Sequence, residues 1–179
     1  ARPDIPVHWV VFSGRGIRRD EARASAEQFL AGTETPNVQL HSFRDGFFPF
    51  CGADVKQAFE DLKKTVRPDL ILTHHRQDLH QDHRVIGELT WNTFRDHTIF
   101  EYEIPKYEGG LVTPNLFVEI EEQVLRRKVD ILLSTFASQR EKRWFKPENF
   151  EAIMRLGGLE STAATGLAVG FHGAKLRVA

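Results

Sequence analysis

RPDLILTHHRQDLHQDH, residues 67–83, contains the transition that decides the fold. Arg67-Pro68 ends the helix expected before it, because proline disfavours helical geometry in the residue that precedes it. The apolar run at 69–75 then predicts a buried strand. Residues 73–83 hold four of the chain's eight histidines together with two aspartates. A strand that leads directly into so many ionisable side chains indicates a functional site at its carboxyl end.

The rest of the chain alternates between expected strands and expected helices. Val55, Phe59, Leu62 and Val66, for example, follow the spacing of an amphipathic helix. We expect strands at 7–13, 37–43, 69–75, 98–105, 115–120 and 167–178, and helices at 17–32, 53–66, 83–96, 121–139 and 147–156. This order predicts an α/β fold, a Rossmann-like three-layer sandwich with a mostly parallel sheet. Ligands of such sheets bind beyond the carboxyl ends of the strands, where residues 73–83 are expected.

Length and composition favour one globular α/β domain spanning 1–179. Hydrophobic residues make up 41% of the 179 residues, charged residues 27%, and the formal net charge is −1. This balance gives no sign of a nucleic-acid partner, and no apolar run approaches the roughly 18–20 residues of a membrane span. Cys51 is the single cysteine, so an internal disulfide is excluded and we expect a cytoplasmic protein. A homo-oligomer is compatible with the sequence.

The histidine-rich segment suits a metal or catalytic site. His80 and His83 are three residues apart, so on a helical turn both imidazoles face the same side. Neutral imidazole is a common zinc ligand, and Asp78 or Asp82 would fix which ring nitrogen is free to bind. A catalytic zinc usually has three protein ligands, so a further ligand must come from elsewhere. Isolated loop histidines are usually just solvated, but their density at a strand end favours a site.

His74 and His75 carry less weight, because neither has the helical spacing. One of the two is expected to point into the layer that covers the sheet.

Two families of metal hydrolases have similar motifs. Metallo-β-lactamases use H-x-H-x-D-H, but here Asp78 replaces the first histidine and removes one zinc ligand. The stretch at 67–83 more closely resembles the second motif of the LmbE-like, or PIG-L, family of N-acetylglucosaminyl deacetylases, which reads R-P-D, an apolar strand, then D-x-H-x-D-H. Further segments resemble the same family in the same order: VHWVVFSG at 7–14, RRDEARASAEQF at 18–29, FRDGFF at 43–48, KVDILLSTFASQ at 128–139 and LAVGFHGAKLRV at 167–178.

The resemblance implies roles for five residues. His83 would be the zinc ligand of the motif. His80, as a charged imidazole, would stabilise the oxyanion or protonate the leaving amine, and Asp82 would orient a histidine. Asp78 and Arg18 would bind substrate, although a surface arginine at a helix N-terminus is an equally good interpretation of Arg18.

The implied reaction is hydrolysis of the acetyl amide of an N-acetylated amino-sugar conjugate, a small-molecule substrate. Zinc would acidify a water and polarise the carbonyl, and a carboxylate would take the proton. Other divalent ions also suit such ligands. Two alternatives remain: another zinc hydrolase of the metallo-β-lactamase kind, or a non-catalytic homologue that acts as a binding module.

The sequence departs from the family in two places. The first motif, A-H-x-D-D, which supplies two more zinc ligands and the general base, does not occur in residues 1–179. It would precede Ala1 by about one βα unit, so we expect that the first unit is missing from this chain. Val169 stands where the family often has a glutamate. His172 could substitute for it, but an ordinary strand histidine is the safer interpretation.

We predict that residues 1–179 alone bind zinc weakly and do not hydrolyse amides, because His83 is one of three expected ligands. Metal analysis of the purified chain, together with an assay for acetate release from N-acetylated sugars, measures both properties. Substantial acetate release would mean that the ligand assignment is wrong.

Overall fold

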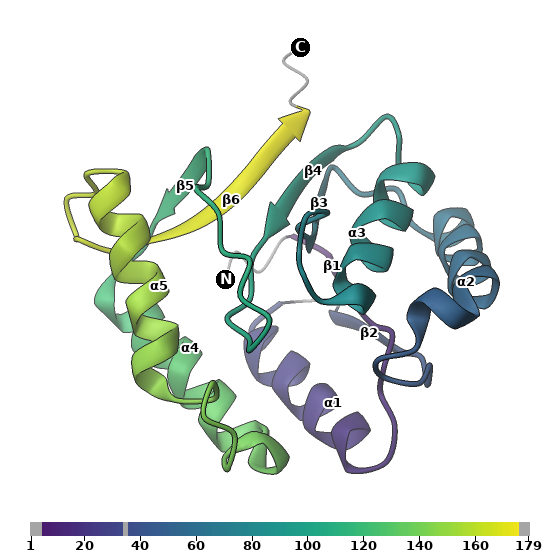
Figure 1. The fold of residues 1–179 in the computed structure, drawn as a ribbon, viewed down its shortest axis with the longest axis horizontal. Helices are drawn as coiled ribbons and strands as arrows, with labels where there is room; N and C mark the ends of the chain where they lie inside the picture. Colours follow the sequence, from purple (N-terminus) through teal and green to yellow (C-terminus); the bar gives the residue numbers. More distant parts are fainter. Residues whose placement is uncertain (1–4, 34–35, 176–179) are drawn as a thin grey trace. The chain divides into compact units, whose positions relative to one another are not determined.

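The computed structural model describes residues 5–33 and 36–175, and it confirms the α/β class (Figure 1). The strands are β1 (Val7–Val11), β2 (Pro36–Leu40), β3 (Leu70–His74), β4 (Thr98–Tyr102), β5 (Leu116–Glu119) and β6 (Ala168–Lys175). The helices are α1 (Ile17–Phe29), α2 (Gly52–Thr65), α3 (Gln81–Thr93), α4 (Glu122–Thr135) and α5 (Pro147–Glu160), with 3₁₀ turns η1 (Phe48–Cys51) and η2 (Ala137–Gln139). Every expected strand and helix is present. The last three residues of the strand expected at 167–178 lie outside the described residues.

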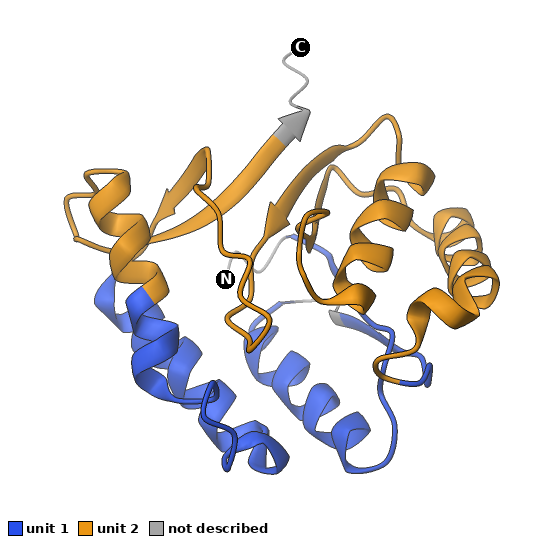
Figure 2. Ribbon diagram, in the orientation of Figure 1, with its two compact units in different colours: residues 1–44, 121–152 blue, residues 45–120, 153–179 orange. Residues whose placement is uncertain are grey.

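The chain divides into two compact units (Figure 2). Unit 1 consists of residues 1–44 and 121–152, and unit 2 of residues 45–120 and 153–179. The single α/β domain expected from the sequence stays a prediction. No helix in the described ranges is both long and apolar enough to cross a membrane.

Unit 1 is built from the parallel pair β1–β2 and the helices α1 and α4, which contact each other. Its core consists of Ala26, Leu30, Leu125, Val129, Ile131, Phe145 and Phe150. Glu21 of α1 is buried beside this core and accepts hydrogen bonds from the Ser138 N–H at 2.7 Å and the Ser138 hydroxyl at 2.6 Å. This carboxylate therefore fixes η2 to α1 within the unit.

Unit 2 contains a sheet with the strand order β3-β4-β6-β5. β3 and β4 are parallel, whereas β6 is antiparallel to both of its neighbours. The expectation of parallel pairing therefore holds for β1–β2 and β3–β4, and the C-terminal strand departs from it. Two helices, α4 and α5, precede β6 along the chain. One helix between two strands brings the chain back so that the second strand is parallel to the first. With two helices between β5 and β6 the chain direction reverses once more, and β6 runs antiparallel to β5.

The core of unit 2 lies where α2 and α3 pack beside the sheet. It contains Phe48, Val55, Phe59, Val66, Ile86, Phe94 and Ile99. Met154 of α5 and the buried Leu167 and Ala168 at the start of β6 belong to the part of the unit where α5 approaches β6. Thr73 of β3 and Thr90 of α3 share a buried hydrogen bond of 2.9 Å. A Cβ at Gly87 would lie 2.7 Å from the His74 carbonyl oxygen, so α3 approaches the strand closely at this point. This packing holds the start of α3 at the carboxyl end of β3.

Gly158 in α5 provides a test of the packing in unit 2. A Cβ there would lie 2.1 Å from the Gly166 carbonyl oxygen, so Gly158→Ala should lower the free energy of unfolding by about 3 kcal/mol or more through overpacking. The matched control is Gly52→Ala at the start of α2, where a Cβ meets nothing within 4 Å. Urea denaturation should show little change or a gain of about 0.5 kcal/mol for the control. Equal urea midpoints for the two variants would contradict the packing.

Candidate metal and catalytic site

The histidine-rich segment forms a turn between β3 and α3. His80 is the N-cap of α3 rather than part of it, and its ring Nδ1 accepts the Asp82 N–H at 3.3 Å. The helix thus begins at Gln81, two residues before the start expected from the sequence. The rings of His80 and His83 nevertheless lie close, with centroids 4.5 Å apart. The expected proximity is present, although its cause is capping geometry and not a shared helical face.

Asp78 connects the residues of this turn. Its side chain is 1% exposed. One carboxylate oxygen lies 3.1 Å from His83 Nδ1 and 2.8 Å from Lys106 Nζ, and the other accepts the His80 N–H at 2.7 Å. Burial by itself raises the pKa of Asp78, but the donors from Lys106, His80 and His83 outweigh it, so the pKa lies below its ordinary value. Asp78 is therefore an anion that orients the turn.

His83 has the arrangement expected of a metal ligand. Burial lowers its pKa, an effect that Asp78 partly offsets. A neutral ring that donates from Nδ1 to Asp78 leaves the lone pair of Nε2 available. His74 stacks on this ring with centroids 4.0 Å apart, and burial lowers the pKa of His74 to about 3. Both rings are consequently neutral near pH 7.

Asp82 binds the backbone of a neighbouring loop. It is 3% exposed, and its oxygens accept the backbone N–H groups of Gly46 at 2.6 Å and Phe48 at 3.1 Å. These contacts attach the Asp-Gly loop to the first turn of α3. The expected action of Asp82 on a histidine ring stays a prediction.

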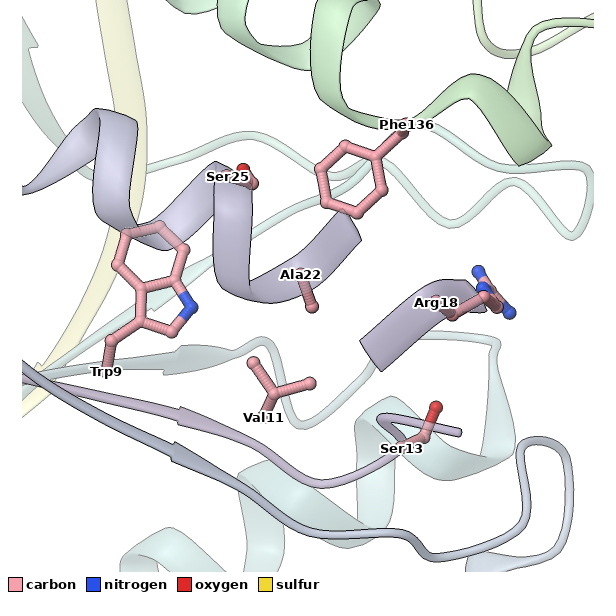
Figure 3. A pocket seen from close by; sticks show the side chains of 7 residues that line it. All are labelled: Trp9, Val11, Ser13, Arg18, Ala22, Ser25 and Phe136. Carbon is pink, nitrogen blue, oxygen red and sulfur yellow. The ribbon is translucent and has the colours of Figure 1, made fainter. Parts of the chain in front are cut away.

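Arg18, the fifth residue implied by the resemblance, lies in unit 1, whereas the other four lie in unit 2. It lines a pocket of about 190 Å³ (Figure 3). The other lining residues are Trp9, Val11, Ser13, Ala22, Ser25 and Phe136. Figure 3 shows Arg18 at the end of this pocket nearest to Ser13. Ligand pockets usually begin at roughly 300 Å³, so this pocket admits only part of a sugar conjugate.

A second cluster in unit 2 was not expected from the sequence. Potential metal-binding atoms of His75, Glu103 and His172 all lie within 4.8 Å of one another. His75 Nδ1 lies 2.7 Å from the buried carboxylate of Glu101. Burial raises the pKa of Glu101, but hydrogen bonds from Arg76 and His75 outweigh it and lower the pKa overall. The signal in the sequence is only that 75, 103 and 172 fall in expected strands, and spacing alone does not reveal that they meet.

Residues 8–94 match the sequence profile of the PIG-L family, described as GlcNAc-PI de-N-acetylase. This segment is therefore a PIG-L, or LmbE-like, family sequence, and the resemblance drawn from the motifs is confirmed. A search of curated protein sequences finds no match.

Solved structures share the fold. The 4-carboxy-2-hydroxymuconate hydratase of Pseudomonas putida KT2440 matches with TM-score 0.69 and 19% identity over 96% of this chain and 85% of that chain. The N,N'-diacetylchitobiose deacetylase of Pyrococcus horikoshii matches with TM-score 0.61 and 18% identity over 87% of this chain and 62% of its own. A deacetylase involved in teicoplanin biosynthesis matches with TM-score 0.63 and 14% identity over 89% of this chain and 72% of that chain. Identities this low show the Rossmann-like fold and leave the reaction open.

Asp82→Ala tests whether this carboxylate holds the loop. Two backbone donors would lose a charged acceptor, so the free energy of unfolding should fall by about 2–3 kcal/mol in urea denaturation. Asp69→Ala, at an exposed aspartate before β3, is the control and should change the free energy of unfolding by less than about 0.5 kcal/mol. A stable Asp82→Ala protein would show that the loop is held by other contacts.

Proposed function

We propose that this protein removes the acetyl group from an N-acetylated amino-sugar conjugate, of the N-acetylglucosaminyl type, by zinc-assisted hydrolysis. The observation that carries the proposal is the pair formed by His83 and Asp78. A neutral imidazole with Nε2 available stands at the carboxyl end of a parallel strand. It does so within the segment that matches the GlcNAc-PI de-N-acetylase profile.

The residues present fit one ligand of a zinc site. A carboxylate that binds the distal nitrogen of a ligating histidine is a recurrent feature of zinc proteins. Lys106 compensates the charge of Asp78, so the carboxylate can stay ionised while His83 stays neutral. The family resemblance assigns two further ligands and the general base to the A-H-x-D-D motif. Zinc, when bound, supplies a Lewis acid that acidifies water.

His80 is proposed to act on the acyl group. Its Nδ1 accepts the Asp82 N–H, so in the neutral tautomer implied by this hydrogen bond the Nε2–H is the donor available to a ligand. Such a donor beside His83 can stabilise an oxyanion or deliver a proton to the leaving amine. A charged His80 would have to give up the capping bond, because both nitrogens then donate. Asp82 supports this geometry through the loop at Gly46.

Arg18, Asp78 and the structural relatives bear on how a substrate would bind. Arg18 is proposed to reach a substrate hydroxyl or phosphate from its pocket. The burial of Asp78 favours support of His83 over direct contact with substrate. Two proteins of similar fold are named as deacetylases, one of them for N,N'-diacetylchitobiose, and this supports an N-acetylated small molecule as the substrate.

The single cysteine supports a cytoplasmic location.

Two histidine variants of the full-length protein separate metal binding from turnover. His83→Ala should weaken zinc binding at the His83 site by about 100-fold or more and abolish acetate release. His80→Ala should retain the metal and lower kcat by about 10²–10⁴-fold. Metal analysis and acetate release from N-acetylated sugars measure these effects, and His8→Ala, at an exposed histidine of β1, should change neither.

Three results would count against the proposal. Loss of zinc from His80→Ala would reverse the assigned roles. Absence of acetate release from the wild-type full-length protein would exclude the deacetylase activity. Because a hydratase shares the fold, hydration of an unsaturated carboxylic acid without any acetate release would replace the proposal with that activity.

A further inference from the structure

We propose that His75, Glu103 and His172 form a second divalent-cation site, suited to zinc and separate from the site proposed at His83. The inference does not depend on the deacetylase activity. It rests on the register of the sheet, on a buried imidazole nitrogen, and on a largely buried carboxylate; among the described residues the nitrogen has no hydrogen-bond partner, and the carboxylate contacts a backbone N–H and a histidine.

The pairing of three strands brings these residues to one face of the sheet. Thr73 of β3 pairs with Glu101 of β4, which in turn pairs with His172 of β6. Directly paired residues share a face, and residues two apart along a strand share it as well. His75 follows Thr73 by two positions and Glu103 follows Glu101 by two, each one residue beyond the end of its strand. The cluster is therefore a consequence of register and not of proximity in the sequence.

The same alternation separates this cluster from His83. His75 follows the last residue of β3, and its N–H still bonds to the Tyr102 carbonyl of β4 at 3.0 Å, so the strand alternation continues and the side chains of His74 and His75 leave on opposite sides. His74 stacks on the His83 ring with centroids 4.0 Å apart. His75 stacks instead on His172, also with centroids 4.0 Å apart. His74, the last residue of β3, and His75, which follows it, thus contribute to two different groups of histidines.

His75 carries the nitrogen that points to a ligand. The residue is 8% exposed, and its Nε2 is buried without a hydrogen-bond partner among the described residues. Its Nδ1 lies 2.7 Å from Glu101, whose carboxylate also accepts from the Arg76 backbone N–H at 3.1 Å and the Arg76 Nε at 2.6 Å. An ionised Glu101 requires the proton on Nδ1, and this leaves the lone pair on Nε2. In metal sites, a carboxylate that accepts from one ring nitrogen of a histidine fixes the other nitrogen toward the metal in the same way.

Glu103 supplies the negative charge. Its side chain is 11% exposed, and its Oε1 accepts the Val112 N–H at 2.8 Å and lies 3.0 Å from His172 Nε2. No lysine or arginine side chain in the described ranges forms an ion pair with it. A carboxylate that is largely removed from water is costly without a cation. A protonated His172 would supply one charge, but it would leave His75 Nε2 without a partner, whereas a divalent ion satisfies all three groups.

The donor set selects the class of ion. Two imidazole nitrogens and one carboxylate oxygen suit zinc, whereas calcium and magnesium prefer sites made only of oxygen. Bonds of about 2.1 Å in a tetrahedron place ligand atoms about 3.4 Å apart, so side chains now within 4.8 Å need only a small adjustment. Three protein ligands leave a fourth position for water. The ion would link β3, β4 and β6 and would stabilise the fold through binding.

Zinc titration of metal-free full-length protein in a His83→Ala background tests the site. One zinc per chain should bind at this second site, in contrast to the weak zinc binding predicted from His83 alone, and zinc should raise the Tm. Adding Glu103→Gln, which keeps an acceptor for Val112, or His172→Phe, which keeps a ring against His75, should weaken zinc binding about 100-fold or more. His97→Gln, at a histidine before the amino end of β4, is the matched control and should bind zinc like its parent.

Two further measurements make the result decisive. Co²⁺ in the same background should give the visible absorption of a four-coordinate site, and Glu103→Gln should remove it. In ¹⁵N NMR spectra of the metal-free protein, His75 should be the Nδ1–H tautomer, and zinc should shift the Nε2 resonances of His75 and His172. Zinc binding that is absent from the His83→Ala protein, or equally tight after Glu103→Gln, would overturn the proposal. Neither outcome depends on acetate release, so the deacetylase proposal stands or falls separately.

Discussion

Consecutive side chains of a β-strand point to opposite faces, and this constraint organises unit 2 at the carboxyl end of β3. Thr73 and His75 face the side on which Glu101 lies, while His74 contacts the ring of His83. A shift of the strand by a single residue would exchange these partners. The parallel pairing of β3 with β4 and the buried hydrogen bond from Thr73 to α3 therefore determine which histidines meet.

Two buried carboxylates then hold the histidines in place by the same physical means. Asp78 binds His83 and is balanced by Lys106, and Glu101 binds His75 and is balanced by Arg76. A carboxylate removed from water has to be matched by donors and by positive charge, so its position tolerates little variation. Each histidine is oriented by a group that is itself fixed from several directions, and such an arrangement gives metal ligands a defined tautomer and direction.

The fold leaves the reaction open, since a hydratase and two deacetylases share it with this chain. Function on such a scaffold depends on the side chains placed at the strand ends. The PIG-L match over residues 8–94 covers all five residues that the resemblance singled out, but Asp82 and Asp78 are occupied by backbone and side-chain donors within unit 2. These two aspartates therefore position neighbouring groups of the site, and both are buried, so little of their surface is open to a ligand.

The sequence by itself determined the order of helices and strands, because periodicity, proline and glycine act over a few residues; the buried Val55 and Phe59 of α2 are an example. It also determined that His80 and His83 lie close together. Only the tertiary structure decided that β6 runs antiparallel, that Asp82 binds the loop at Gly46, and that residues 75, 103 and 172 meet. Those contacts depend on sheet register and on the packing of distant segments, and spacing along the chain encodes neither.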